Sequence, residues 1–306
     1  MEKLDSLPSE THIDVLIMAA SVDKRCYAVF EKFLTNCITI DRIVILDYAK
    51  TRPMPKSSEY SEYYKLNSYP NVEYIPCNTD DCEYISKADF SSSSKVFIDI
   101  TSISVPDIFR IFYVFKEFLK IETINVVYAE PGYYNYFNGL YFAYEEDVVE
   151  REYTPLSEYF TSAVSRDVVL VCFLGFERLI SKYIHERKEH SDVIAINGFP
   201  AYYPKLKDIS LAHNYELIST IGLNCVRYAQ ANNPFSAYNT LVEIKDSNTD
   251  KLLDICVLGS KPMALGACMF ALRNPQIVKV SYPFPKASRV HTSIEVSNLW
   301  LYTITL

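Results

Sequence analysis

The second half of this 306-residue chain repeats the order of the apolar segments found in its first half. A long internal period constrains a fold more than any single motif, because it predicts how often one structural unit recurs. Four segments recur in the same order, at offsets of roughly 150 to 158 residues; they begin at Asp14 and Asp167, Ile43 and Val193, Phe97 and Ile255, and Val126 and Val280. Such a period is that of a domain and not of a solenoid repeat.

Short apolar runs alternate with helical patterns in both halves, which is typical of βαβ units and a parallel sheet. We therefore predict an α/β fold of two tandem Rossmann-like parallel-sheet halves related by pseudo-two-fold duplication. The expected boundaries place the first half at 1–131, a tyrosine-rich connector at 132–165 and the second half at 166–306. The strand-like stretches in the C-terminal tail fall within that second half.

Composition excludes several classes of function. The net charge is −8 and the acidic residues are scattered, whereas an extended nucleic-acid surface needs a basic stripe. A small anionic ligand in a locally basic pocket remains compatible with this charge. No apolar run reaches the length of about 18 residues expected of a membrane span, and the polar start lacks a signal-peptide pattern. We expect a cytoplasmic protein that does not enter a membrane.

The strongest candidate site is the turn Gly259-Ser260-Lys261, which joins an expected strand to an expected helix. Ligands of open parallel sheets bind outside the carboxyl ends of the strands. Gly259 permits close backbone approach, Ser260 supplies a hydroxyl and Lys261 a point charge suited to phosphate or carboxylate. The alternative is an ordinary strand–turn–helix in which Ser260 is the N-cap and Lys261 is solvated.

The first-half counterpart of this turn is rich in hydroxyl groups. Thr101 and Ser102 can bind an anion or a ribose, while Asp99 either hydrogen-bonds a ligand sugar or ties down the following loop. The loops after the first strand of each half add Ser21 and Gly175 as candidate ligand contacts. Loop 197–203 offers two tyrosines that can reach a ligand from the side, although a surface position is the simpler interpretation.

Motifs for common chemistries are missing from the sequence. There is no Gly-x-Ser-x-Gly elbow and no Gly-x-Gly-x-x-Gly, so we expect neither a hydrolytic triad nor a dinucleotide cofactor. The histidines are scattered, and Cys77 and Cys82 have no second cysteine pair at metal-site spacing. We therefore expect no metal, no cofactor and no catalytic residue of an established type.

The segment Gly259-Ser-Lys-Pro-Met-Ala-Leu-Gly-Ala267 resembles the Gly-Thr-Lys-x-Met type signature of CARF domains. These are Rossmann-like sensors of cyclic oligonucleotides in prokaryotic antiviral defence. A duplicated chain is similar to the fused arrangement of SAVED domains, in which the pocket lies across a two-fold. The resemblance implies that Gly259, Ser260 and Lys261 contact the ligand, with Thr101 and Ser102 as degenerate partners. It also implies a sensor that reports to a partner protein or effector.

These observations favour a non-enzymatic module that binds a nucleotide-like or other phosphate-bearing ligand. One alternative is a nucleotide-processing hydrolase or glycosyl-transfer enzyme, with Asp99 or Glu177 as the acid–base residue. A further alternative is an interaction subunit of a multi-protein complex, docking through residues 132–165.

Overall fold

The computed structural model divides the chain into two compact units, Met1–Tyr136 with Val290–Leu306, and Phe137–Arg289. It describes residues 1–20, 23, 25–48, 66, 68–77, 95–134, 148–152, 167–176, 190, 192–285 and 293–306. The second unit is therefore inserted in the sequence of the first. No helix of this described part is long and apolar enough to cross a membrane.

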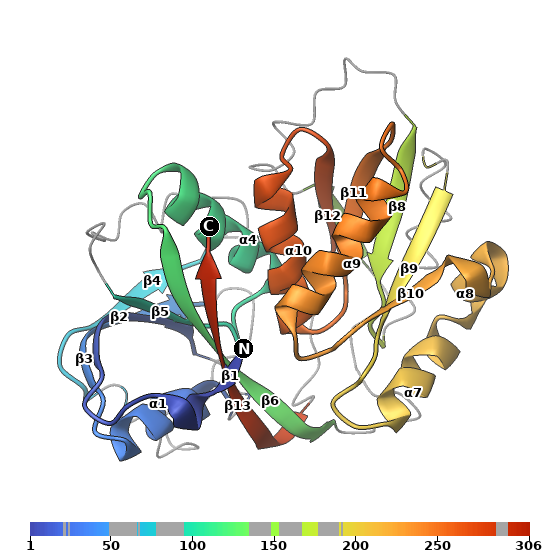
Figure 1. Ribbon diagram of the computed structural model, residues 1–306. Helices are drawn as coiled ribbons and strands as arrows, with labels where there is room; N and C mark the ends of the chain where they lie inside the picture. Colours follow the sequence, from blue (N-terminus) through green and yellow to red (C-terminus); the bar gives the residue numbers. More distant parts are fainter. Residues whose placement is uncertain are drawn as a thin grey trace. The chain divides into compact units, whose positions relative to one another are not determined.

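The first unit contains a seven-stranded sheet in the order β1-β13-β6-β5-β2-β3-β4 (Figure 1). Strands β2 to β6 are parallel, whereas β13 runs antiparallel to β6 and β1 antiparallel to β13. The strands are β1 (Glu2–Lys3), β2 (His12–Ala19), β3 (Thr39–Asp47), β4 (Val72–Pro76), β5 (Val96–Asp99), β6 (Thr123–Tyr134) and β13 (Ser293–Thr305).

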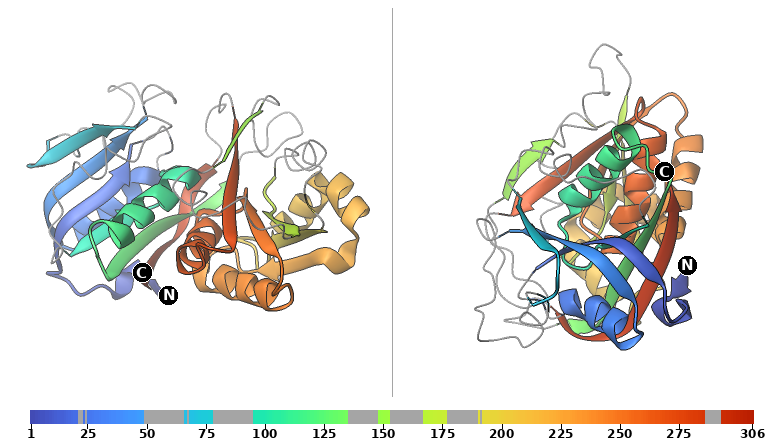
Figure 2. Two further views of the ribbon diagram at one scale, coloured as in Figure 1. Left: turned by 90° about the horizontal axis from the view of Figure 1, so that it is seen from above. Right: turned by 90° about the vertical axis from the view of Figure 1, so that its left-hand side faces the viewer.

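Among the described residues, two helices cover the first sheet, α1 (Arg25–Thr35) between β2 and β3 and α4 (Val105–Glu117) between β5 and β6. These two crossovers run in opposite directions along the sheet, so right-handed connections place α1 and α4 on opposite faces (Figures 1 and 2). The core beneath α1 includes Phe30 and Phe33 of the helix with Leu16 and Ile43 of the sheet, all at most 1% exposed.

The second unit contains a six-stranded sheet in the order β10-β9-β8-β11-β12-β7. Strands β8 to β12 are parallel, and β7 is antiparallel to β12. The strands are β7 (Val148–Glu152), β8 (Val168–Phe173), β9 (Asp192–Gly198), β10 (Val226–Ala229), β11 (Leu252–Val257) and β12 (Val278–Pro285). Its five parallel strands follow the same order as β6-β5-β2-β3-β4 of the first sheet, but the antiparallel strand β7 precedes them in the chain whereas β13 follows them.

The described helices of the second unit are α7 (Lys205–His213), α8 (Tyr215–Ile221), α9 (Pro234–Asp246) and α10 (Lys261–Arg273). Leu170 and Cys172 of β8 pack toward α8, in a cluster with its Leu217 and Ile218. Helices α9 and α10 pack against each other (Figure 1). Gly266 permits their contact, because a Cβ atom there would lie 2.2 Å from the carbonyl oxygen of Pro234.

The predicted α/β class with parallel sheets is confirmed, and the two sheets share one strand order; duplication of the sequence stays a prediction. The expected boundaries differ from the two units at the C-terminus. Strand β13 pairs with β6 along its length, so the tail belongs to the first unit although it was assigned to 166–306. The connector 132–165 also differs, since it holds the end of β6 and all of β7. Hydrogen bonding to a partner strand decides which unit a strand joins, even when that partner is distant in the sequence.

We expect Ile304→Ala to destabilise the first unit by about 2–5 kcal/mol, because Ile304 is fully buried in β13. Thr305→Ala, at an exposed neighbouring position, serves as the control and should change the free energy of unfolding little. Urea unfolding measures both. Hydrogen exchange should show lost protection in β6; loss confined to β12 would contradict the assignment of β13 to the first sheet.

Candidate functional site

Each sheet has one point at which the strand order reverses, where parallel α/β sheets commonly bind ligands. In the first sheet this point lies between β2 and β5, and in the second between β8 and β11. The loops at the carboxyl ends of these strands carry the predicted site residues. Asp99, Thr101 and Ser102 come together in the first unit, and Gly175, Gly259, Ser260 and Lys261 lie on two such loops of the second.

Asp99 is the last residue of β5 and is only 2% exposed. Its Oδ1 accepts hydrogen bonds from the backbone N–H of Thr101 at 2.9 Å and from Thr101 Oγ1 at 2.5 Å. Its Oδ2 has no hydrogen-bond partner among the described residues. One oxygen therefore ties down the following loop, as one of the two expected roles required, and the other is left for a proton or a ligand.

Burial raises the pKa of Asp99 to about 7, although the hydrogen bonds from Thr101 and the charge of Arg25 act in the opposite direction. The hydroxyl of Thr101 is committed to the protein, because it also accepts from the backbone N–H of Ala129 at 2.9 Å. Thr101 and Ser102 are both buried. Their role as ligand contacts stays a prediction.

A largely buried ion pair lies near Asp99. Arg25 Nη2 and Asp23 Oδ2 are 2.7 Å apart, and Arg25 Nη1 donates to the carbonyl oxygen of Ala129 at 3.0 Å. Burial raises the pKa of Asp23, but Arg25 outweighs this effect and the pKa is lowered. Ser293, the first residue of β13, donates to Asp23 Oδ2 at 2.7 Å. Strand β13 thereby helps to fix the loop after β2. Ser21 lies outside the described residues.

In the second unit Ser260 is the N-cap of α10. Its Oγ accepts from the backbone N–H of Met263 at 3.3 Å and donates to the carbonyl oxygen of Ala231. Pro262 has no N–H, so the first turn of α10 offers an anion at most the N–H of Lys261. This arrangement is the N-cap alternative for Ser260. Its expected contact with a phosphate stays a prediction and would require the bond to Ala231 to break.

Gly259 and Gly198 bring two loops together over Met263. A Cβ atom would lie 3.2 Å from Met263 Sδ at Gly259 and 3.7 Å from it at Gly198. The carbonyl oxygen of Ala231 also accepts from Tyr202 Oη at 3.3 Å. The loops after β9, β10 and β11 therefore meet at one carbonyl group.

Gly175 is buried, and its carbonyl oxygen accepts from Ser210 Oγ at 2.9 Å and Asn214 Nδ2 at 3.0 Å. It anchors α7 and α8 to the end of β8. Glu177 and most of the segment 132–165 lie outside the described residues.

A set of aromatic and basic side chains at the ends of β9 and β10 went largely unrecognised in the sequence. Phe199 and Tyr228 are 50% and 47% exposed, and their ring centroids are 6.0 Å apart. Lys207 Nζ lies 5.3 Å from the Phe199 ring and Lys205 Nζ 5.7 Å from the Tyr203 ring. We call these five residues the aromatic–basic rim. Its sequence signal is an aromatic residue directly after a strand, followed by lysines.

No protein-family model matches the chain, and no curated protein matches it. Among solved structures, a putative universal stress protein from Pseudomonas aeruginosa UCBPP-PA14 is 8% identical, with 90% of this chain and 94% of that chain covered and a TM-score of 0.28. A universal stress protein from Archaeoglobus fulgidus DSM 4304 is 11% identical, with 89% and 96% covered and a TM-score of 0.25. A functionally unknown protein from Pseudomonas aeruginosa PAO1 is 7% identical, with 90% and 93% covered and a TM-score of 0.26.

We expect Asp99→Asn to remove a pH-dependent loss of stability. A carboxyl whose pKa rises on folding favours the folded state at low pH, and this contribution is lost between the unfolded value of 3.8 and about 7. The free energy of unfolding of the variant, relative to that of the wild type, should therefore rise by about 3 kcal/mol from about pH 5 to about pH 7.5. Urea unfolding at both pH values measures this. Asp250→Asn, at an exposed position, is the control; a pH-independent difference for Asp99→Asn would contradict the raised pKa.

We expect Ser260→Ala to cost about 1 kcal/mol of stability through loss of the N-cap. Ser260→Thr should retain most of this stability. Ser247→Ala should have little effect, because the exposed hydroxyl of Ser247 donates only to the backbone carbonyl oxygen of Glu243 in the preceding helical turn. Thermal unfolding of the three variants decides; an unchanged midpoint for Ser260→Ala would contradict the capping role.

Proposed function

We propose that this protein is a non-enzymatic ligand-binding module that takes a nucleotide-like, phosphate-bearing ligand at the carboxyl edge of its second sheet. The observation that supports this most is the aromatic–basic rim. Two aromatic rings about half exposed and two lysine side chains lie at the carboxyl ends of β9 and β10, beside the point between β8 and β11 at which the strand order reverses. Isolated exposed aromatics are common, but this combination offers both a stacking face and cations.

The rim and the turn at Gly259 share a neighbour, which makes them parts of one candidate site. Phe199 follows Gly198, and a Cβ atom placed on Gly198 would lie 3.4 Å from Ala231 Cβ. Ser260 donates to the carbonyl oxygen of the same Ala231. A ligand whose base stacks on Phe199 or Tyr228 can extend its phosphate toward Lys261.

The resemblance to CARF domains supplies the ligand class to test first, cyclic oligonucleotides, together with a prokaryotic antiviral defence setting. A module without its own activity reports ligand binding through a protein partner or effector. Binding can do so if the ligand has a higher affinity for one of two conformations and the partner recognises that conformation.

We expect Phe199→Ala to weaken nucleotide binding by roughly 5- to 150-fold, since stacking of a base on an aromatic ring contributes about 1–3 kcal/mol. Lys261→Ala should weaken binding of phosphate-bearing ligands and leave α10 capped. Calorimetry with mononucleotides and cyclic oligonucleotides measures the affinities. Leu223→Ala is the matched control, because Leu223 is 73% exposed but lies before the amino end of β10, away from the carboxyl ends of the strands.

Failure of every member of the panel to bind, or equal affinities for Phe199→Ala and Leu223→Ala, would rule out this assignment. Mass spectrometry of small molecules released from the purified protein extends the panel without assuming a ligand class.

A second candidate function is a nucleotide-processing enzyme, because Asp99 has the raised pKa and the spare oxygen of an acid–base residue. In that case the wild type converts a nucleotide during prolonged incubation, and Asp99→Asn abolishes conversion while Asp250→Asn does not. Chromatography of the products distinguishes this candidate from the binding module, for which no turnover is expected.

A further inference from the structure

A cluster of potential metal ligands lies at the amino-terminal ends of β2 and β3, the edge of the first sheet opposite Asp99. It consists of His12, Asp14 and Asp41. The cluster arises from strand geometry. His12 pairs with Thr39 and Ile13 with Ile40, and the parallel register continues to the next positions. Because side chains alternate between faces, His12 and Asp14 share a face with Thr39 and Asp41.

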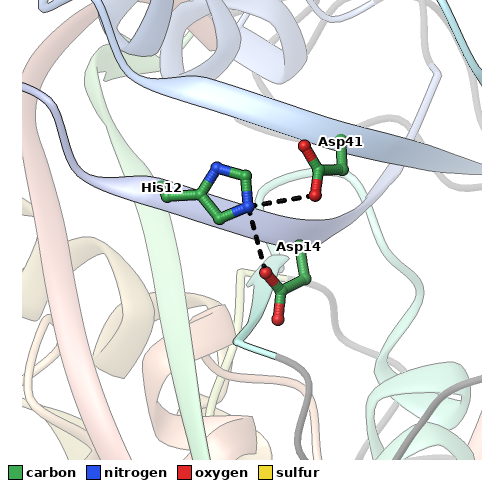
Figure 3. A group of neighbouring side chains, drawn as sticks. All are labelled: His12, Asp14 and Asp41. Atoms are coloured by element: carbon green, nitrogen blue, oxygen red, sulfur yellow. Dashed lines mark ion pairs between the residues drawn. The ribbon is translucent and has the colours of Figure 1, made fainter.

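The geometry of the cluster centres on one atom. His12 Nε2 lies 3.3 Å from Asp14 Oδ1 and 3.0 Å from Asp41 Oδ2 (Figure 3). Ligand atoms around a zinc ion with bonds of about 2.0–2.2 Å are about 3–3.5 Å apart. The ring nitrogen of His12 is therefore already at separations from both carboxylates that metal ligands adopt, and the three ligand atoms all lie within 4.8 Å of one another.

The other ring nitrogen of His12 has its own partner. His12 Nδ1 and Thr39 Oγ1 are 2.9 Å apart. A hydrogen bond donated by Nδ1 leaves Nε2 as the atom that faces the carboxylates, an arrangement common for metal-bound histidines. Asp14 is also held, because its Oδ2 accepts from the backbone N–H of Lys95 at 2.5 Å.

The point where the three side chains converge suits a positive charge. Two carboxylate oxygens converge on one ring nitrogen, so either a proton on Nε2 or a metal ion must lie between them. A neutral imidazole with two carboxylates matches the charge of a divalent ion, and one nitrogen with two oxygens suits zinc and similar transition metals. The half-exposed position of the side chains, at 53%, 35% and 62%, leaves room for water as a further ligand.

We propose that His12, Asp14 and Asp41 form a binding site for a divalent transition-metal ion. Such an ion joins β2 to β3 and, through Asp14, to the residue before β5. It stabilises the amino-terminal edge of the first sheet and is distinct from the carboxyl-edge site in the second unit. If this metal-site proposal proves wrong, the proposed nucleotide site in the second unit is not affected.

The test is titration of the purified, metal-stripped protein with Zn²⁺ in competition with a chromophoric chelator. We expect one ion per chain, with affinity lowered at least about tenfold in His12→Gln and in Asp41→Asn. Thr39→Val should weaken binding by about tenfold, because it removes the partner that orients the ring. His213→Gln and Cys37→Ser are controls for adventitious binding to another histidine or to an exposed thiol.

A second measurement does not depend on the chelator. Zn²⁺ should raise the unfolding midpoint of the wild type and of both controls but not that of His12→Gln, since an ion that binds only the folded state stabilises it. The proposal is overturned if the wild type takes up no zinc, if the cluster variants bind as the wild type does, or if Cys37→Ser loses the ion. In the first case His12 Nε2–H donates to the two carboxylates and no metal ion is bound.

Discussion

The antiparallel pairing of β13 with β6 is the constraint on which the first unit depends. The last strand of the chain covers the edge of a parallel sheet whose other strands all lie in the first 134 residues. Glu130 of β6 holds the irregular part of this pairing by accepting from Ser297, Asn298 and Trp300. A buried carboxylate with three donors avoids the cost of an unpaired charge. Through Ser293 the same strand reaches Asp23.

The candidate functions occupy different edges because the two ends of a parallel sheet present different chemistry. At the carboxyl ends, strands lead into loops and helix starts, where Asp99 in one unit and the aromatic–basic rim in the other are found. At the amino ends, register alone brings His12, Asp14 and Asp41 together. A ligand site and a metal site can therefore coexist in one chain without sharing a residue.

Local patterns anticipated much of the fold. The apolar run before Ala20 is β2, and the Ser260-Lys-Pro segment begins α10 with the cap that was weighed as an alternative to a ligand contact. The cap also changes one equivalence that the predicted repeat implied. Ser104 caps α4 as Ser260 caps α10, so by this role the counterpart of Ser260 is Ser104 and not Ser102. The offset between matching residues changes because the loop before α4 is longer.

The sequence by itself determined the strands and helices with clear apolar periodicity and caps, such as β2 and α10, because these signals act between residues close in the chain. It did not determine β7, which lies within the expected connector. Only the tertiary structure decided that β13 returns to the first sheet, that Asp99 is buried with one oxygen unpartnered among the described residues, and that Asp41 stands beside His12. Each of these depends on which distant strands pair and in which register. Many pairings bury the same apolar residues, and the choice among them rests on contacts made only when the whole sheet has formed.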